Sequence, residues 1–388
     1  VIMITTKRAK AGDARVNFDA KWGVNMAARQ LYDYTRDPGQ YYEMHYSSLK
    51  NFYQNEKGLD PSAAHVAANN ALTSNGEGGL GYNVFTVPAG QTLIGSNGKL
   101  NPNATLGRKF EHNGQEYYVT PDDWYDELYD PSFRQEYNLS IAAASEKSNF
   151  FASFGYLNNK GITDGSDMYR WTARLRADYQ AKKWLKIGGN MSYTNFNWNG
   201  ASEGSAGDGN ADVFAAVADM APIYPVYIRD GEGNIMIDKN GYKRYDYGAG
   251  DNAGLNRPIM ANGNPLSATM LDTNNSEGNA LNGNGFAEFK IIDGLKVTIN
   301  GSVSLDETRY TGVTNPYYGQ YATSNGIVTI QHSRSIAYNL QQLINYNKTF
   351  GKHSIEALLG HEYYNVQGYS VYGSKSNMFS QENTELGG

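Results

Sequence analysis

The sequence predicts an all-β fold, an antiparallel transmembrane β-barrel whose long loops carry short helices. Three observations support this prediction. About nine segments alternate polar and apolar residues, the connections between them differ in length at the two ends, and tyrosine is in excess. The 388 residues include 31 tyrosines, against 14 phenylalanines and 5 tryptophans. The sequence has no apolar run of about 18 residues, which excludes transmembrane helices.

The segment 169–179 shows the alternation most clearly. Because successive strand side chains point to opposite faces, it has one apolar and one charged face. Aromatic rings stand at both ends of the apolar face, with small aliphatic residues between them, as in a strand that crosses a bilayer. A strand of a soluble sandwich alternates in the same way, so this segment alone leaves both folds open. The predicted lipid-facing residues are Trp22, Tyr169, Trp171, Leu175 and Tyr179.

The charged face of this segment predicts that the barrel has a water-filled lumen. An arginine on the lipid face near the bilayer midplane costs roughly 2–4 kcal/mol, so arginines of a spanning strand must point inward. We expect these side chains to pair with Asp178 and with other carboxylates of the wall. The alternative is a basic patch that contacts another part of the protein or steers anionic solutes. The predicted lumen-facing residues are Arg170, Arg174, Arg176 and Lys186.

The first part of the chain predicts two strands and a long insertion. Residues 1–7 (VIMITTK) lack period-two polarity, which predicts a strand buried on both faces. Residues 16–25 alternate and have the length that a tilted strand needs to cross a bilayer. The following insertion is too long for a plain connection and predicts an ordered, functional excursion. Its predicted helices are 37–50, 61–72 with Asp60 as N-cap and Pro61 at its first position, and 121–129 with Thr120 as N-cap.

The regular region begins at residue 137 with four alternating segments, and more strands follow residue 280. The Asp293–Gly294 turn is the strongest hairpin signal in the chain. Between the two groups of strands we expect a helix over 212–220 and a hairpin over 230–238. The predicted long loops are 26–136, 197–279 and 307–334.

Loop lengths distinguish the barrel from the sandwich. After the first strand the connections run long, short, medium, short, very long, short, long and short. One end of the strands therefore carries tight turns and the other carries elaborate loops, which is the asymmetry of outer-membrane barrels. A soluble sandwich seldom repeats this asymmetry over nine strands, so the sequence favours the membrane barrel.

Composition argues against several kinds of function. The net charge of −6 is unlike the basic footprint of a nucleic-acid-binding protein. The absence of cysteine excludes disulfide scaffolds, thiolate metal sites and cysteine nucleophiles. The HEYYN stretch at His361 lacks the spacing and the helix of a zinc motif. The stretch that begins at Asp230 partly resembles a calcium-binding loop, but Ile235 stands where that loop needs glycine. We therefore predict no catalytic residues, no metal site and no cofactor.

Aromatic residues in the long loops are the best binding candidates. A ring stacks on a sugar face or packs against a partner protein, and tyrosine keeps a hydroxyl for hydrogen bonding. For any single ring, the simpler expectation is that it packs the loops against each other. The candidate residues are Trp198, Tyr242, Tyr245, Tyr247, Tyr317, Tyr318 and Tyr321.

Three stretches resemble the SusC/RagA family of TonB-dependent outer-membrane transporters. Residues 1–10 (VIMITTKRAK) resemble the end of that family's plug, and 123–162 (beginning DWYDELYDPSF) resemble its early barrel strands. MAPIYPVY (220–227) resembles its proline-containing motif in a long outer loop. The resemblance covers nearly the whole chain and implies a barrel of about 22 strands with an N-terminal plug. It assigns residues 1–10 to the end of the plug and 11–388 to the first part of the barrel.

The resemblance also implies a function. We expect import of a large nutrient, an oligosaccharide in the first place, with a peptide or a metal chelate or cofactor as alternative cargo. The implied partners are a SusD-like surface lipoprotein, the TonB complex through a region that this chain lacks, and outer-membrane lipid. The chain opens without an initiator Met, and we expect it to be a piece of a longer protein. The alternative of another class is a secreted, soluble glycan-binding β protein, in which the Leu175 face meets a second sheet.

Overall fold

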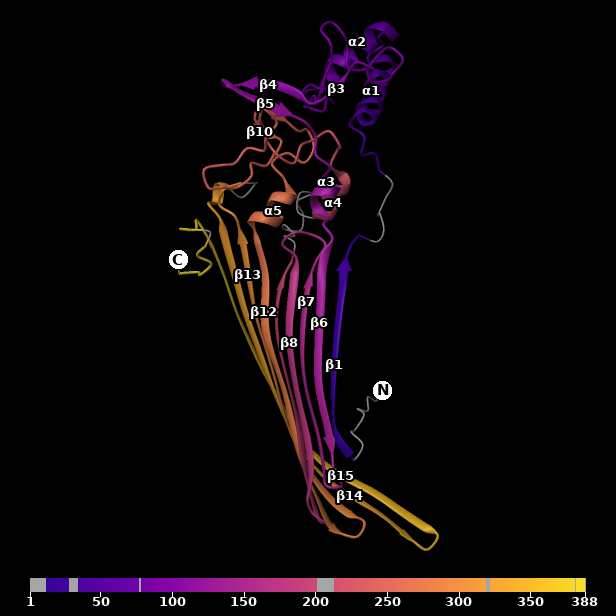
Figure 1. Cartoon of the computed structure of the whole chain (residues 1–388), viewed down its shortest axis with the longest axis vertical. Coiled ribbons are helices and arrows are strands. Elements are labelled where there is room, and N and C mark those ends of the chain that lie inside the picture. The colour runs from indigo at the N-terminus through magenta and orange to yellow at the C-terminus, as the bar shows by residue number, and fades with distance from the viewer. Residues whose placement is uncertain are drawn as a thin grey trace.

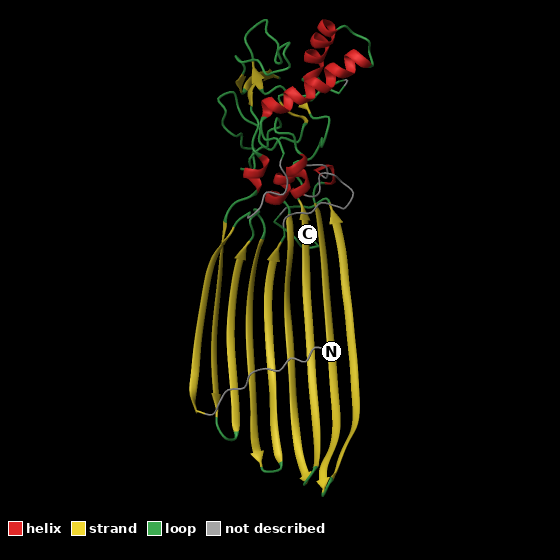
Figure 2. Ribbon diagram, turned by 90° about the vertical axis from the view of Figure 1, so that its right-hand side faces the viewer, coloured by secondary structure: helices red, strands yellow, loops and turns green. Residues whose placement is uncertain are grey.

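A computed structural model describes residues 12–27, 34–76, 78–200, 213–318, 322–380 and 382–387. Within these residues, nine long strands form one antiparallel sheet in the order β1-β6-β7-β8-β9-β12-β13-β14-β15 (Figures 1 and 2). Each long strand pairs with the next along the chain, so the sheet is an up-and-down meander. The strands are β1 (Gly12–Asn25), β6 (Ser132–Ala144), β7 (Ser148–Lys160), β8 (Asp167–Lys182), β9 (Leu185–Asn199), β12 (Thr273–Ile292), β13 (Leu295–Thr314), β14 (Ile327–Phe350) and β15 (His353–Ser376).

The connections differ at the two ends of the sheet, as the sequence predicts. The short turns lie together at one end, and the long connections gather beyond the other end (Figures 1 and 2). The predicted turn at Asp293–Gly294 joins β12 to β13. We call the described parts of 34–131, 213–272 and 315–326 the loop layer. The expected strand over residues 1–7 and the expected plug end over 1–10 lie outside the described residues.

The sheet has two chemically different faces. Side chains that lie directly opposite one another on neighbouring strands share a face. Leu175 of β8 is opposite Ala152 and Met191, and we call this the outer face. Arg174 is opposite Ser153 and Ser192, which defines the polar face. The predicted alternation is therefore confirmed in the register of the strands.

Helices and short strands make up most of the loop layer. Asp37 and Asp60 are the N-caps of α1 and α2, and each has an extended backbone conformation. The predicted start of α2, with Asp60 as N-cap and Pro61 at the first helical position, is confirmed. The elements are α1 (Pro38–Asn55), α2 (Pro61–Leu72), α3 (Trp124–Leu128), α4 (Val213–Asp219), α5 (Pro265–Leu271), β2 (Phe85–Thr86), β3 (Thr105–Leu106), β4 (Arg108–His112), β5 (Gln115–Val119), β10 (Ala249–Asn252), β11 (Leu255–Asn256) and a 3₁₀ turn (Ala322–Ser324).

The third predicted helix is shorter than expected and has another cap. It begins at Trp124, and the carboxylate of Asp123 accepts hydrogen bonds from the N–H groups of Tyr125 and Asp126, at 3.0 and 3.2 Å. Thr120 is therefore not its cap. A carboxylate accepts these bonds with a full negative charge at the positive end of the helix, which favours it over a hydroxyl.

Two predicted loops are also shorter than expected, because the strands beside them are longer. The loop predicted over 197–279 spans 200–272, and the loop predicted over 307–334 spans 315–326. Likewise β6 begins at Ser132, inside the insertion predicted to end at residue 136. Most of the added residues on the outer face are polar, so hydrophobic alternation does not mark these segments, although their backbones continue the ladder.

The hydrophobic core lies in the loop layer rather than on the sheet. Its fully buried side chains include Tyr42, Tyr82 and Ile223, whereas Trp22 on the outer face is 62% exposed. A smaller cluster joins Val313, Val328 and Met378 at the loop-side end of the sheet. Among the described residues, no helix is long and apolar enough to span a membrane. The sheet thus presents two open faces, and the loops fold as a unit above it.

A glycine substitution tests the turn between β12 and β13. Gly294 has φ of 85°, and a Cβ there would come within 2.8 Å of the carbonyl oxygen of Asn347. We expect Gly294→Ala to lower the free energy of unfolding by about 1–2 kcal/mol, because a Cβ is strained at positive φ. The measurement is the urea midpoint of the full-length protein in lipid vesicles. Gly301→Ala is the control, since a Cβ there meets nothing within 4 Å. Equal midpoints for the two variants would contradict the prediction.

Candidate functional site

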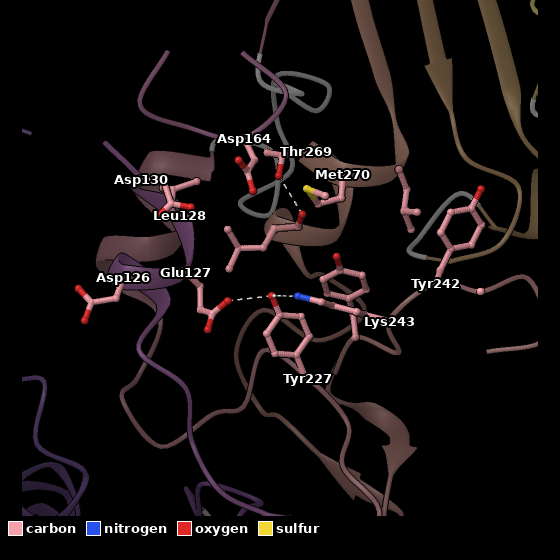
Figure 3. A pocket seen from close by; sticks show the side chains of 14 residues that line it. Asp126, Glu127, Leu128, Asp130, Asp164, Tyr227, Tyr242, Lys243, Thr269 and Met270 are labelled. Atoms are coloured by element: carbon pink, nitrogen blue, oxygen red, sulfur yellow. Dashed lines mark hydrogen bonds between the residues drawn. The ribbon is translucent and has the colours of Figure 1, made fainter. Parts of the chain in front are cut away.

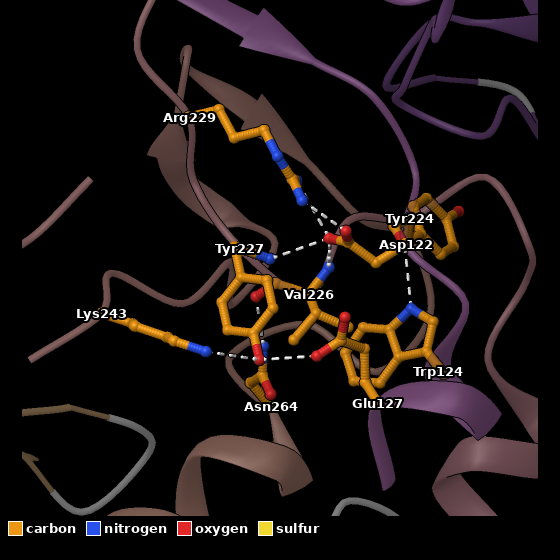
Figure 4. A network of polar contacts seen from close by, with 9 residues as sticks. All are labelled: Asp122, Trp124, Glu127, Tyr224, Val226, Tyr227, Arg229, Lys243 and Asn264. Carbon is orange, nitrogen blue, oxygen red and sulfur yellow. Dashed lines mark hydrogen bonds and ion pairs between the residues drawn. The ribbon is translucent and has the colours of Figure 1, made fainter. Parts of the chain in front are cut away.

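Two stretches that are far apart in the sequence hold each other in the loop layer (Figure 4). The carboxylate of Asp122 accepts hydrogen bonds from the N–H groups of Val226 and Tyr227, at 2.8 and 3.2 Å. It also forms an ion pair with Arg229, with 3.0 Å between Nη1 and Oδ2. The indole N–H of Trp124 donates to the carbonyl of Tyr224 at 2.8 Å. The DWYDELY and MAPIYPVY motifs of the sequence are therefore parts of one structure.

The prolines of MAPIYPVY explain why side chains hold this segment. Pro222 and Pro225 have no N–H, so the segment cannot complete a regular ladder. Buried backbone groups still need partners, and side chains of other segments supply them. The amide of Asn264 donates to the carbonyl of Val226 at 3.0 Å. Ile223 and Val226 are fully buried, which anchors the segment in the core of the loop layer.

A pocket of about 520 Å³ lies beside this segment, and we call it the tyrosine pocket (Figure 3). The hydroxyl of Tyr227 donates to Glu127 at 2.8 Å and accepts from the ammonium of Lys243 at 3.4 Å. Lys243 also lies over the Tyr227 ring, 4.6 Å from its centroid. The side chains around the pocket are Asp126, Glu127, Leu128, Asp130, Asp164, Tyr227, Tyr242, Lys243, Tyr245, Leu266, Thr269, Met270 and Leu271.

The lining of the tyrosine pocket combines flat apolar surfaces with hydrogen-bonding groups. Burial raises the pKa of Tyr227, and it raises the pKa of Tyr245 to about 12. Both phenols therefore remain protonated donors at neutral pH. Carboxylates of four residues offer acceptors, and Lys243 offers a donor. Such a mixture of rings and a few placed polar groups orients a polar ligand that has apolar faces.

A buried carboxyl supports the loop layer near the tyrosine pocket. Asp246 is completely buried and accepts hydrogen bonds from the hydroxyl of Tyr82 at 2.9 Å and from the amide of Asn252 at 2.7 Å. The N–H of Gly248 donates to it at 2.7 Å. Burial raises the pKa of Asp246 to about 6, although the nearby Arg257 acts in the opposite direction. This group ties the segment after α2 to the segment before α5.

The structure collects most of the predicted loop aromatics into one cluster. Tyr242 and Tyr245 line the tyrosine pocket, and the Tyr317 ring lies 5.8 Å from that of Tyr242. Tyr247 and Tyr318 stack with their ring centroids 6.0 Å apart. Tyr245 and Tyr247 are buried, so they also pack the loops, whereas Tyr317 is 38% exposed.

Two of the predicted loop aromatics lie elsewhere. Trp198 is not in a loop, because it belongs to β9, on the polar face of the sheet. Tyr321 lies outside the described residues. Sequence reasoning missed Glu127 and Tyr227, which meet in the pocket. Glu127 lies within DWYDELY and Tyr227 ends MAPIYPVY, so the family resemblance of these two stretches was the available signal.

The predicted basic residues lie together on the polar face. Arg170 and Arg174 line a hollow of about 380 Å³ with Thr172 and Thr194. Lys186 forms an ion pair with Asp178, with 3.4 Å between Nζ and Oδ2, as the pairing hypothesis expects. Arg176 lies two residues after Arg174 on β8, directly opposite Phe151 of β7 and Asn190 of β9.

No metal-binding group emerges from the described residues. They contain no group of three or more His, Asp or Glu side chains placed to hold a metal ion. Asp230 binds the N–H groups of its own hairpin, from Glu232 at 3.0 Å and from Asn234 at 2.9 Å. The stretch after Asp230 that partly resembles a calcium-binding loop is thus a hairpin turn.

Aromatic rings form a band on the outer face near the loop layer. The indole of Trp22 donates to the hydroxyl of Tyr137 at 3.0 Å. Tyr137 stacks on Tyr156, with centroids 6.4 Å apart, and Tyr156 lies 4.1 Å from Trp171. At the turn end of the same face, Trp184 stacks on Phe289 across 6.3 Å. Rings therefore mark both ends of the outer face.

Comparisons with known proteins agree with this architecture. The chain is 24% identical over 262 residues to TonB-dependent receptor P3 of Formosa agariphila, a match to 67% of this chain and 24% of the relative. It is 24% identical over 249 residues to TonB-dependent receptor SusC of Bacteroides thetaiotaomicron, covering 62% of this chain and 24% of that protein. No family model matches the chain. The chain therefore spans about a quarter of the length of these relatives.

The fold matches a solved transporter. The structure of the RagAB peptide importer in its open-open state aligns with a TM-score of 0.63 and 20% identity, covering 98% of this chain and 38% of that chain. A second structure, of the RagAB peptide transporter, aligns with a TM-score of 0.62. The chain is thus an outer-membrane β-barrel protein of the TonB-dependent receptor class. Its sequence and fold are similar to those of the SusC/RagA family.

The buried Asp246 predicts a pH dependence of stability. Its pKa is about 6 in the fold and 3.8 without burial, so the folded state binds the proton more tightly. Its contribution to stability is complete below about pH 4 and is lost as the pH rises through about 6, by on the order of 3 kcal/mol. The measurement is the urea unfolding free energy of the full-length protein at several pH values.

Asp246→Asn should flatten that pH dependence. The amide keeps an acceptor for Tyr82, and Asn252 can turn its unpartnered oxygen toward the new amide group. Glu232→Gln removes an exposed carboxyl of the loop layer and is the control. The prediction fails if the difference between wild type and Asp246→Asn stays constant from pH 4 to pH 7.

Proposed function

We propose that this chain forms part of a TonB-dependent importer of a large nutrient, and that an oligosaccharide is its cargo. The observation that carries the proposal is the two-faced meander with the tyrosine pocket in its loop layer. The protein binds and admits its cargo without covalent chemistry. A SusD-like surface lipoprotein is proposed as partner above the loop layer. The TonB complex is proposed to drive the import.

In this proposal the outer face contacts lipid. Tyr169 and Tyr179 lie ten residues apart on β8, which corresponds to about 33 Å along the strand and about 25 Å in height at a tilt near 40°. That height is close to the apolar band of an outer-membrane barrel. Leu175 is 43% exposed between them. Trp22, Tyr169, Trp171, Leu175 and Tyr179 are the proposed lipid-facing residues.

The polar face is then the proposed lumen wall, with Arg170, Arg174, Arg176 and Lys186 upon it. Within the described residues, β1 and β15 each pair along one edge. Because unpaired backbone groups in hydrocarbon cost several kcal/mol each, both edges need further strands in the membrane. A soluble sandwich has less support, since the other sheets among the described residues are two-stranded and belong to the loop layer.

The tyrosine pocket favours an oligosaccharide over the other cargoes. Tyr227, Tyr242 and Tyr245 offer ring surfaces, while the surrounding carboxylates accept hydrogen bonds from hydroxyl groups. A peptide is the second candidate, because the structurally similar RagAB is named a peptide importer. A metal chelate or cofactor has no specific support in the described pocket. Growth of cells carrying the full-length protein on defined oligosaccharides or on peptides tests the choice.

The lipid-facing assignment predicts the effect of a charge at residue 175. We expect Leu175→Arg to lower the free energy of unfolding in vesicles by about 2–4 kcal/mol, because the charge lies near the bilayer midplane. Ser302→Arg places the same charge on the polar face and should change it little. A nitroxide at residue 175 should report lipid. If it reports water in the assembled protein, the assignment of the two faces is wrong.

The tyrosine pocket predicts a graded loss of cargo binding. We expect Tyr242→Ala to weaken binding of an imported oligosaccharide by about three- to tenfold, because a stacking surface is lost. Tyr242→Phe keeps the ring and should bind almost as tightly as wild type. The measurement is titration calorimetry of the full-length protein with its lipoprotein. Unchanged binding by Tyr242→Ala would remove this pocket from the uptake path.

A further inference from the structure

The polar face carries a row of aromatic rings just below the loop layer. Ser276 of β12 lies directly opposite Trp198 of β9 on one side and Tyr310 of β13 on the other. Tyr310 is in turn opposite Gln331 of β14, and Gln331 is opposite Tyr372 of β15. The three rings therefore lie in one row across five strands, each separated from the next by one polar residue. We call Trp198, Tyr310 and Tyr372 the ring row.

Glycines allow two of these rings to lie flat along the wall. A Cβ added at Gly200 would come within 2.8 Å of Cη2 of Trp198, and one added at Gly312 would come within 2.8 Å of the Tyr310 hydroxyl. Each ring thus occupies the space above a glycine two residues further along the chain, Gly312 within β13 and Gly200 just after β9. A ring in this position rests one face on the backbone and leaves the other face open. Trp198 is 44% exposed.

The position of the ring row connects it with the tyrosine pocket. Trp198 lies one residue before the end of β9, and Tyr310 lies four residues before the end of β13. Both strand ends lead into the loop layer (Figure 1). Phe196 extends the aromatic surface one row further down, where its ring lies 2.7 Å from the Cβ position of Gly278. In the proposed import path, cargo that has passed the loop layer meets the ring row at the entrance to the lumen.

We propose that the ring row is a stacking site for a linear oligosaccharide on the lumen wall. Neighbouring strands lie about 4.8 Å apart, so rings on alternate strands recur about every 10 Å. A chain of sugar rings presents flat apolar faces at regular intervals, and its hydroxyls need polar groups between the stacking positions. Ser276 and Gln331 stand at those places. This inference rests on the proposed import function and narrows its cargo to glycans.

An extended peptide fits the ring row less well. Peptides that bind sheets add as a strand at an edge, where backbone N–H and C=O groups are free. Trp198 and Tyr310 lie on β9 and β13, which are paired on both sides. The backbone around these two rings therefore has no hydrogen bonds to offer, and side-chain stacking is the interaction that remains there. Stacking on regularly spaced rings selects for a ligand with regularly spaced flat faces.

The test is calorimetric binding of cellohexaose, maltohexaose and mannohexaose to the full-length protein purified in detergent. We expect Trp198→Ala and Tyr310→Ala each to weaken binding of the preferred hexasaccharide by about three- to tenfold. Trp198→Phe should retain most of the affinity. Gly312→Ala keeps the Tyr310 ring but displaces it, so it should also weaken binding. Phe154→Ala, which removes a ring 50% exposed on the outer face, is the control and should change nothing.

The outcomes separate this inference from the proposed function. If wild type binds a hexasaccharide and the ring-row variants bind it equally well, the ring row is not a binding site, although glycan import stands. If the variants lower the urea midpoint and leave saccharide affinity unchanged, the rings pack against another part of the protein, and the inference is overturned. If no saccharide binds and a hexapeptide does, both the glycan cargo and the ring-row site are wrong.

Discussion

Continuous backbone pairing between neighbouring strands is the constraint on which the rest of this structure depends. Each of the nine strands pairs with the next along the chain, and the register shifts only beside a few turns. Pairing without slips keeps every side chain on one face, because a shift of one residue would exchange the faces. The separation of Leu175 from Arg174 across the whole sheet follows from it. The loop layer can then vary without disturbing the wall.

The two parts of the molecule are stabilised in different ways. The wall has backbone hydrogen bonds but few buried side chains, and the large apolar residues on its outer face remain exposed without a surrounding medium. The loop layer contains the buried core, the ion pair of Asp122 with Arg229 and the buried Asp246. In the proposed assembly, lipid covers the outer face of the wall as the core covers the buried side chains of the loops. Because the loop layer has its own buried core, it can form a pocket above the open sheet.

The sequence predicted what depends on local periodicity and missed what depends on tertiary contacts. The strands around Leu175, the Asp293–Gly294 turn and the cap of α2 follow from alternation, turn chemistry and N-cap preference. The extension of β9 beyond residue 196 was missed because its outer-face residues, Asn197 and Asn199, are polar. Trp198 was assigned to a loop for that reason. The meeting of Glu127 with Tyr227 joins segments 100 residues apart, which no local pattern reveals.

Glycine connects the chemistry of the wall with its geometry. An aromatic ring on a strand ordinarily stands away from the sheet, and a neighbouring side chain keeps it there. Gly200 and Gly312 remove that neighbour, so the rings of Trp198 and Tyr310 lie along the wall. Glycine in a strand interior weakens the strand, so the presence of Gly312 within β13 needs a compensating reason. In the proposed importer a flat ring on the lumen wall supplies one, because it would bind cargo without obstructing its passage.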